Sequence, residues 1–329
     1  MVKNIFICFL ISLILTFILG CIFIPILKKL KAKQTILKYV ESHKNKKGTP
    51  TMGGLFFIPV CTLVYILFCG IKGKIANAVI SIGLAYLLVG FLDDFIKIKF
   101  MKNEGLKPYQ KIIFQSAIAL VSGLFCYFNG LTVLYIPFVK KTVDFSFWIV
   151  PFTFFIFLAI TNSVNLTDGI DALASSVSAS YLIFILVLIG VEQSVFSHLY
   201  LESEEYEKLM LLTSSLIGGI LGFLIFNVPK AKVFMGDTGS LSLGGFIGAI
   251  SIFSGNSLFI PLLGICFVFS SVSVILQVLY FKKSKGKRIF LMSPFHHHLE
   301  LKGLSESKIS YLYSLVTIIM GVILLISYL

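Results

Sequence analysis

Five aspartates lie at the edges of long apolar stretches, where their carboxylates could bind a metal ion or take part in phosphate chemistry. They are Asp93, Asp94, Asp168, Asp171 and Asp237. Ionisable groups at the border of a membrane are costly, so they usually belong to a site, a relay or a transport pathway. These five come from three separate segments of the sequence. A site that gathers them at one membrane face is the first functional hypothesis.

Asp93 and Asp94 occur in "GFLDDFIKIK", where Lys97 follows at positions i+4 and i+3. On a helix, this spacing puts the lysine on the same face as the carboxylates. Adjacent carboxylates repel each other unless a cation is near, so the segment suits a hard metal ion, the counter-ion of a bound phosphate, or one base of raised pKa. A solvated helix end with a single ion pair is the alternative.

The stretch "ITNSVNLTDGIDALA" joins two apolar segments without a lysine or an arginine. Its polar groups, Asn162, Asn165, Asp168 and Asp171, could bind the edge of a polar ligand. Asp168 and Asp171 are three residues apart, so one helical turn would bring them together. Asn, Asp and Gly also favour caps and turns, so a purely structural turn is the alternative.

A glycine-flanked aspartate is found in "NVPKAKVFMGDTGSLSLGG", which begins with Asn227 and contains Asp237 just before an expected helix start. Glycine lets a phosphate approach the backbone closely, and exposed amides at a helix start favour anions. The segment lacks the pattern of a Walker loop. Capping of the helix by Asp237 or Thr238 is the alternative.

Lysines precede a glycine-rich segment in "SHKNKKGTPTMGG", where Lys44, Lys47 and Thr49 could bind a diphosphate. Lysines beside an apolar span are also ordinary membrane anchors. By itself this segment does not decide between the two roles.

Three adjacent histidines, His296, His297 and His298, lie in "FLMSPFHHHLELKG". A purification tag normally sits at a terminus, whereas this run lies inside the chain. Three consecutive side chains diverge and no cysteine is near, so a closed zinc site is not expected. One or two of these histidines could donate hydrogen bonds to a phosphate, with Glu300 as a local partner.

The elements that position these residues are membrane helices. The chain of 329 residues is 57% hydrophobic with a mean hydropathy of +0.97, and its charged fraction of 13% is about half that of soluble proteins. Apolar stretches near the ~20 residues needed to cross a bilayer predict about ten transmembrane helices. They are 5–27, 53–71, 75–93, 111–129, 147–164, 172–191, 209–227, 238–255, 257–280 and 309–328. The expected fold is one all-α polytopic membrane domain over residues 1–329.

The basic residues predict the orientation. With the amino terminus outside, the inner loops hold 22 of the 28 Lys and Arg, in segments 28–52, 94–111, 227–239 and 281–308. The positive-inside bias therefore puts both termini outside and the candidate site on the cytoplasmic face. The net charge of +13 then reflects topology and attraction to the lipid bilayer or to an anionic substrate, and no nucleic acid partner is expected.

The five motifs, in this order over about residues 42–303, closely resemble those of the phospho-N-acetylmuramoyl-pentapeptide-transferase family, in the polyprenyl-phosphate N-acetylhexosamine-1-phosphate transferase superfamily. The matching stretches are "KKGTPTMGG", "FLDDFIK", "NLTDGID", "VFMGDTGSLSLGG" and "FLMSPFHHHLELKG". The histidine triplet is typical of the muramoyl-pentapeptide branch. One departure is "ALA" at 172–174, where the family more often has Gly-Leu-Ala.

The resemblance implies a multi-pass enzyme of the bacterial inner membrane, which would be a homodimer. It would transfer phospho-N-acetylmuramoyl-pentapeptide from UDP-MurNAc-pentapeptide to undecaprenyl phosphate with Mg²⁺, giving lipid I and UMP in peptidoglycan synthesis. Such a transfer can proceed by positioning and charge neutralisation without a strong base, so a role for Asp93 or Asp94 as a base stays open.

Carried over by motif, the resemblance also implies roles for single residues. Asp237 would bind Mg²⁺, with Asp93 and Asp94 at the metal and lipid-phosphate end. The remaining residues would bind the donor, with Lys97, Asn162 and Asp168 at its nucleoside end and the histidines at its phosphates or sugar. The expected substrate-binding set is Lys44, Lys47, Thr49, Lys97, Asn162, Asn165, Asp168, Asp171, Asn227, His296, His297 and His298.

Two alternatives remain. A sister transferase that uses UDP-GlcNAc would share most motifs, but the histidine triplet argues against it. A cation-coupled secondary transporter would place its acids near the bilayer midplane on broken, repeated helices. Here the acids lie at the inner ends of spans, and no repeat is evident.

Overall fold

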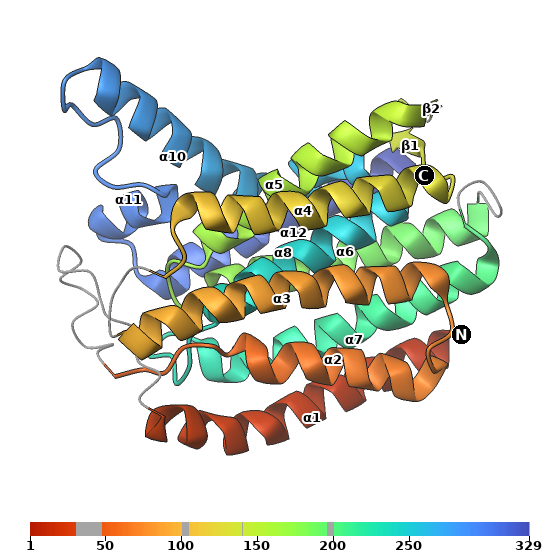
Figure 1. Ribbon diagram of the computed structural model, residues 1–329, viewed down its shortest axis with the longest axis horizontal. Coiled ribbons are helices and arrows are strands. Elements are labelled where there is room, and N and C mark those ends of the chain that lie inside the picture. Colours follow the sequence, from red (N-terminus) through yellow and green to blue (C-terminus); the bar gives the residue numbers. More distant parts are fainter. Residues whose placement is uncertain (31–47, 101–104, 140, 196–200, 329) are drawn as a thin grey trace.

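The computed structural model describes residues 1–30, 48–100, 105–139, 141–195 and 201–328. These residues form a bundle of long helices that run along a common direction (Figure 1). The long helices are α1 (Val2–Lys29), α2 (Gly54–Cys69), α3 (Lys74–Phe100), α4 (Pro108–Phe128), α5 (Ile149–Thr167), α6 (Leu173–Val195), α7 (Ser203–Asn227), α8 (Gly236–Phe253), α10 (Ile265–Lys283) and α12 (Glu306–Tyr328). The short elements are β1 (Val133–Ile136), β2 (Lys141–Asp144), η2 (Ser146–Trp148), η3 (Ser257–Phe259), α9 (Ile260–Leu263) and α11 (Phe295–Leu301).

Eight of the helices in the described part of the chain are long and apolar enough to cross a membrane. They are α1, α3, α4, α5 together with η2, α6, α7, α10 and α12. The prediction of an all-α polytopic membrane protein is therefore confirmed. The count of ten spans stays a prediction, because α2 has only 16 residues and α8 is rich in glycine and serine.

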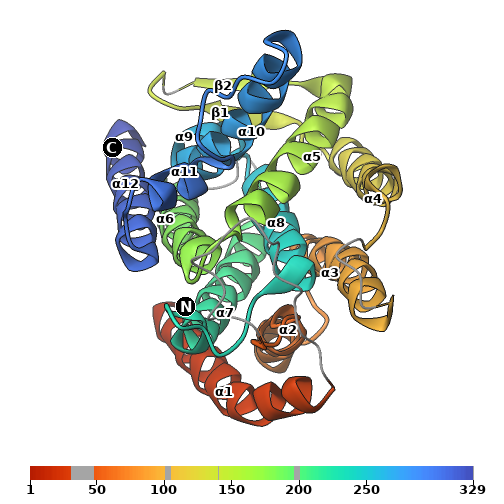
Figure 2. The ribbon, with the colours of Figure 1, turned by 90° about the vertical axis from the view of Figure 1, so that its left-hand side faces the viewer.

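Helix α8 forms the centre of the bundle, with α2, α3, α5 and α6 around it (Figure 2). Every residue from Thr238 to Phe253 is buried. Small residues make this packing possible: a Cβ on Gly245 would lie 2.6 Å from the ring of Tyr86, and one on Gly244 would lie 2.6 Å from the Cα of Thr161. Because α8 is surrounded by protein, its low apolar content is compatible with membrane depth.

The two ends of the bundle differ. Both chain termini and the antiparallel pair β1–β2, in which Val133 pairs with Asp144, lie at one end (Figure 1). The last turns of α3, the start of α8 and the short helix α11 lie at the other end. The chain thus brings several of the candidate site motifs to the end opposite its termini.

Candidate active site

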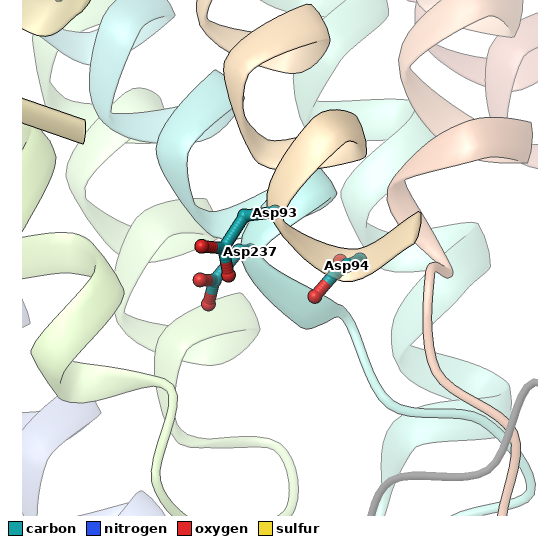
Figure 3. A group of neighbouring side chains, drawn as sticks. All are labelled: Asp93, Asp94 and Asp237. Atoms are coloured by element: carbon teal, nitrogen blue, oxygen red, sulfur yellow. The ribbon is translucent and has the colours of Figure 1, made fainter. Parts of the chain in front are cut away.

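The three carboxylates of Asp93, Asp94 and Asp237 lie together (Figure 3), each offering an oxygen within 4.8 Å of the others. Asp93 and Asp94 come from the last turns of α3, and Asp237 from the first turn of α8. The two helices can meet because of Gly90, where a Cβ would overlap the backbone carbonyl of Asp237.

Two lysines hold these carboxylates together. Lys97 Nζ lies 2.5 Å from Asp93 Oδ2, 3.0 Å from Asp237 Oδ2 and 3.8 Å from Asp94 Oδ1. Lys111 Nζ, from the first turns of α4, lies 2.6 Å from Asp237 Oδ2 and 3.5 Å from Asp93 Oδ1. With all five groups ionised, one negative charge is left over. Sequence reasoning missed Lys111, because a lysine near the start of an apolar helix reads as a membrane anchor.

The buried carboxylates of α3 have different partners. Asp94 Oδ2 accepts hydrogen bonds from the amide (2.9 Å) and the hydroxyl (2.7 Å) of Thr238. Asp94 thereby caps the N-terminus of α8 from a neighbouring helix. Asp93 Oδ1 accepts from the amide of Leu106 at 2.9 Å. The alternative of a solvated helix end is wrong, since Asp93 and Asp94 are only 1% and 3% exposed.

Helix α5 adds amide side chains to the same cluster. Asn165 Nδ2 donates to Asp237 Oδ1 and to Ser240 Oγ, both at 2.8 Å. One turn earlier, Asn162 Nδ2 donates to Gln115 Oε1 of α4 at 2.7 Å. The structure therefore places Asn165 directly against Asp237, while Asn162 lies in the neighbouring layer between α4 and α5.

Asp168 and Asp171 lie in a non-helical turn between α5 and α6, so the expectation that one helical turn joins them is wrong. Burial, followed by the charges of the carboxylate cluster and of Asp171, raises the pKa of Asp168 well above its usual value. Asp171 is engaged in holding the fold. Its Oδ2 accepts from the amide of Ala231 at 3.1 Å, and its own amide donates to Glu306 Oε2 at 3.0 Å.

Asn227 connects three segments through its side-chain amide. Its Oδ1 accepts from the amide of Ala172 at 3.2 Å and from Ser175 Oγ at 2.9 Å, and its Nδ2 donates to the carbonyl of Val233 at 3.1 Å. These bonds fix the end of α7, the start of α6 and the loop before α8. Ala172 needs this support because its φ of 66° is a left-handed conformation that disfavours a side chain.

The segment before α2 runs beside the loop that leads into α8. Its backbone pairs with both the amide and the carbonyl of Phe234, and Thr49 Oγ1 donates to the carbonyl of Ala231 at 3.4 Å. Thr49 therefore contacts the loop that leads into α8 and Asp237. Lys44 and Lys47 lie outside the described residues.

The histidine triplet lies on α11, and the prediction that its three side chains diverge is only partly right, because the ring centroids of His296 and His297 lie 4.4 Å apart and only His298 turns away. His296 is fully buried against the α5–α6 turn, where a Cβ on Gly169 would overlap its imidazole. The same Cβ would lie 3.0 Å from His297 Nε2, while His297 Nδ1 lies 3.1 Å from Glu300 Oε2. Two of the three histidines thus adjoin the turn that carries Asp168.

His298 turns to the other side of α11. Its Nδ1 accepts a hydrogen bond from the amide of Leu291 at 3.1 Å, and its ring packs with those of Phe290 and Phe295. Burial and the charge of Lys302 lower the pKa of His298. The neutral imidazole that this favours is the form that can accept the amide bond.

The cluster of carboxylates suits a divalent cation of the Mg²⁺ type, which prefers oxygen ligands. Asp237 is the most accessible of the three, with 18% of its side chain exposed. The excess negative charge, the oxygen donors and two adjacent ammonium groups make the site able to bind a metal ion together with phosphates. All three carboxylates offer an oxygen to such an ion, and Asp237 is the most accessible to it.

Comparisons with known proteins agree with this chemistry. The pattern of glycosyl transferase family 4 matches residues 76–255, and signature 1 of the phospho-N-acetylmuramoyl-pentapeptide-transferases matches residues 46–58. The transferase of that name from Caldanaerobacter subterraneus subsp. tengcongensis is 40% identical over 97% of both chains. That of Listeria monocytogenes serotype 4b is 41% identical over 92% of this chain and 91% of its own.

A third relative of the same name, from Clostridium novyi, is 39% identical over 95% of this chain and 94% of its own. The similarity therefore covers the full set of motifs, from the segment before α2 to α11. The resemblance seen in the sequence is confirmed. The chain belongs to the phospho-N-acetylmuramoyl-pentapeptide-transferase family, in glycosyl transferase family 4.

Proposed function

We propose that the protein transfers phospho-N-acetylmuramoyl-pentapeptide from UDP-MurNAc-pentapeptide to undecaprenyl phosphate, forming lipid I and UMP in an Mg²⁺-dependent reaction. The observation that carries this proposal is the cluster of Asp93, Asp94 and Asp237 with Lys97 and Lys111. It lies in a chain that is about 40% identical to transferases of this name over nearly its whole length.

In the proposed reaction, a phosphate oxygen of the lipid forms a bond to the β-phosphorus of the donor. The bond from that phosphorus to the oxygen bridging it to UMP breaks, and UMP leaves with the electron pair. No proton has to move, because the attacking phosphate is already anionic near neutral pH. The transition state must therefore be stabilised by positioning the two substrates and by neutralising the charges of their phosphates.

The residues of the cluster divide this work. Lys97, which the resemblance placed at the nucleoside end of the donor, lies against the carboxylates and is proposed instead to bind and neutralise phosphate oxygens together with Lys111. Asp237, with Asp93 beside it, would hold Mg²⁺, and the ion would polarise phosphoryl oxygens when bound. Asp94 Oδ2 accepts two hydrogen bonds from Thr238 at the start of α8. Its proposed role is to fix α8, and with it Asp237.

The donor is proposed to lie between the cluster and α11. Asn162 of α5 and Asp168 of the turn after it would face the nucleoside end. Asn165 and Asp171, from the same two elements, would bind the donor beside them. The histidines of α11 would face the phosphates or the sugar. Asn227 would contribute mainly by holding the turn in place, and Lys44, Lys47 and Thr49 would bind the diphosphate from the segment before α2.

We propose ten spans in a single domain, 1–329, of the bacterial inner membrane, with a cytoplasmic site and both termini outside. The basic segments near the site support this orientation. Exposed aromatic residues at the opposite end, Phe128, Phe147 and Trp148, would form an interfacial belt at the outer surface. A homodimer is proposed from the family likeness.

The test is release of UMP by purified protein given UDP-MurNAc-pentapeptide and undecaprenyl phosphate, with Mg²⁺ or with a chelator. Release that needs both substrates and the metal is expected. Turnover with UDP-GlcNAc in place of this donor would assign the protein to the sister branch. Proton-coupled or sodium-coupled uptake by vesicles, without UMP release, would favour a transporter.

A further inference from the structure

The C-terminal end of α10 stands off the helix bundle, at the upper left of Figure 1. The last buried residue of α10 is Gln277, and every residue from 278 to 283 is exposed. The exposed side chains there are apolar before they become basic: Val278, Leu279, Tyr280 and Phe281. This part of α10 is therefore surrounded by lipid or by another partner rather than by its own bundle.

The turn after it, residues 282–288, carries five cations in the sequence "KKSKGKR". It is an ordered turn: Gly286 N donates to the carbonyl of Phe281 at 3.0 Å, and Ser284 Oγ donates to that of Lys287 at 3.2 Å. All five cationic side chains are exposed: Lys282, Lys283, Lys285, Lys287 and Arg288.

In the described part of the chain, no carboxylate balances the charge of this turn. Among the residues that the structure describes, none of the five cations pairs with a carboxylate, whereas Lys97 and Lys111 at the same end of the bundle are bound to aspartates. Exposed carboxylates such as that of Glu204 belong to the start of α7, beside the N-terminus of α3 at the far end. A second copy of the chain is thus poorly suited to neutralise the turn.

The turn is also flanked by exposed apolar side chains on both sides, with Phe281 before it and Ile289 and Leu291 after it. Apolar side chains that flank lysines are suited to a membrane surface. The apolar groups enter the acyl region while the lysines extend to the headgroups. Both the positive charge of the turn and the exposed apolar side chains beside it therefore favour a lipid surface as the partner.

We propose that residues 282–288 form a binding surface for the anionic phospholipid headgroups of the surrounding bilayer, and that a bound headgroup steadies α11. Basic segments next to a membrane attract anionic lipids by roughly fivefold per Lys or Arg. The partner is bulk anionic phospholipid, whose concentration in the membrane is high.

The segment between the turn and α11 is held at two places, by Gln277 of α10 and by His298 of α11. The side chain of Gln277 accepts from the amides of Ile289 (3.1 Å) and Phe290 (3.0 Å) and donates to the carbonyl of Phe290 at 3.2 Å. The next residue, Leu291, donates its amide to His298. A headgroup that holds the turn therefore limits the motion of α11, and this second step rests on the proposed function of its histidines.

The binding step is tested with a single-tryptophan reporter. The chain has one tryptophan, Trp148, which ends η2 directly after β2, the strand at the opposite end of the bundle (Figure 1). The double variant Trp148→Phe, Ile289→Trp places the only indole beside the turn, and Leu291→Trp is a second reporter position if the first fails to fold. In vesicles, brominated phosphatidylglycerol is expected to quench this fluorescence at least about fivefold more efficiently than brominated phosphatidylcholine.

The matched variants remove equal charge from opposite ends. One changes Lys282, Lys283, Lys285 and Lys287 to Gln, and the other changes the exposed Lys3, Lys72, Lys74 and Lys141 to Gln. The preference for the brominated anionic lipid is expected to disappear only in the first. Equal quenching by both lipids in the parent reporter, or no quenching by either, would overturn the proposal, and the latter would point to a protein partner over the turn.

The activity arm uses vesicles of phosphatidylcholine with and without phosphatidylglycerol. Adding the anionic lipid is expected to lower the KM for UDP-MurNAc-pentapeptide severalfold in the natural chain and in the far-end variant, but not in the turn variant. An equal response of all three would overturn the coupling to α11. If none of them turned over substrate, the proposed function would fail while the fluorescence result would still decide the lipid surface.

Discussion

The carboxylate cluster and the histidine helix lie at the same end of the molecule, yet different interactions hold them. Side chains of α3, α4 and α8 build the cluster by pairing with one another, as Lys111 does with Asp237. Helix α11 is instead held largely through its backbone and that of the segment before it. Gln277 binds the backbone of residues 289–290, and Ser273 Oγ accepts from the amide of Phe295 at 3.0 Å.

This difference in how the cluster and α11 are held separates two functions of the site, the rate of transfer and the affinity for the donor. In the cluster, the groups that set the geometry are also the groups that carry charge, so a substitution changes both. On α11, position is set largely by α10 and by the segment before it, while His296 and His297 lie against the turn that carries Asp168. We therefore expect cluster variants to lose the rate of transfer, and α10 variants to lose affinity for the donor.

The largest effect is expected for Asp237→Asn. It keeps the size of the side chain but removes the charge that balances Lys97 and Lys111 and the carboxylate proposed to hold Mg²⁺. We expect kcat to fall by at least about 10²-fold, while the purified protein keeps its helical content and elution volume. Turnover near that of the natural chain would remove Asp237 from the metal site.

A smaller loss is expected for Lys111→Met, which leaves the carboxylates with one counter-charge. Loss of a hydrogen-bonded charged partner costs about 1–3 kcal/mol. The temperature of unfolding in detergent should therefore fall, and kcat should fall by about tenfold or more. Higher Mg²⁺ should restore part of the rate. The control is Lys107→Met at the N-cap position just before the same helix, where the side chain is exposed. If both variants behaved alike, the ion pairs of Lys111 would have no function.

Gln277→Met tests the other side of the comparison. It removes three hydrogen bonds from the segment that leads into α11 but touches no charged group. We expect the KM for the nucleotide donor to rise about tenfold, which corresponds to one or two net hydrogen bonds, with kcat and the Mg²⁺ dependence little changed. Leu276→Met, at an exposed position next to it, serves as the control. A fall in kcat at unchanged KM would mean that α10 and the cluster are not separate.

The smallest effect concerns Ala172, whose left-handed backbone strains a side chain. Ala172→Gly is expected to raise the free energy of unfolding by about 1 kcal/mol. Its control, the buried Ala179→Gly inside α6, should lower it by a similar amount because glycine weakens a helix interior. Thermal unfolding in detergent measures both. A lower stability for Ala172→Gly would show that packing at this buried site outweighs the strain.

Local patterns in the sequence predicted much of the fold and part of the site. The pairing of Lys97 with Asp93 and Asp94 follows from spacing on one helix, and each apolar stretch overlaps one of the long helices. The predicted span 257–280 is nevertheless wrong as a single helix, because η3 and α9 precede α10. Lys111 could not be predicted, since its partner Asp237 is 126 residues away. The role of Gln277 was equally hidden, because its partners are backbone groups that no side-chain pattern reveals.

The turn at residues 168–172 shows a second reason why the sequence did not predict the site fully. Its spacing is compatible with a helix, but Asn227 and Ala231, both far along the chain, bind it in another conformation. The family departure at Ala172 looked conservative by residue type. Only its φ of 66° shows that the position favours glycine.

The central position of α8 also bears on how freely this sequence can vary over evolutionary time. A side chain added at Gly245, Gly244 or Gly239 would clash with Tyr86, Thr161 or Met235, respectively. Larger residues therefore cannot replace these glycines without moving a neighbouring helix or side chain. On α1, by contrast, residues such as Phe6, Leu10 and Ile14 are exposed, and one apolar group can replace another there. Substitutions in related chains should therefore accumulate at the rim of the bundle, while the axis that carries Asp237 stays nearly fixed in composition.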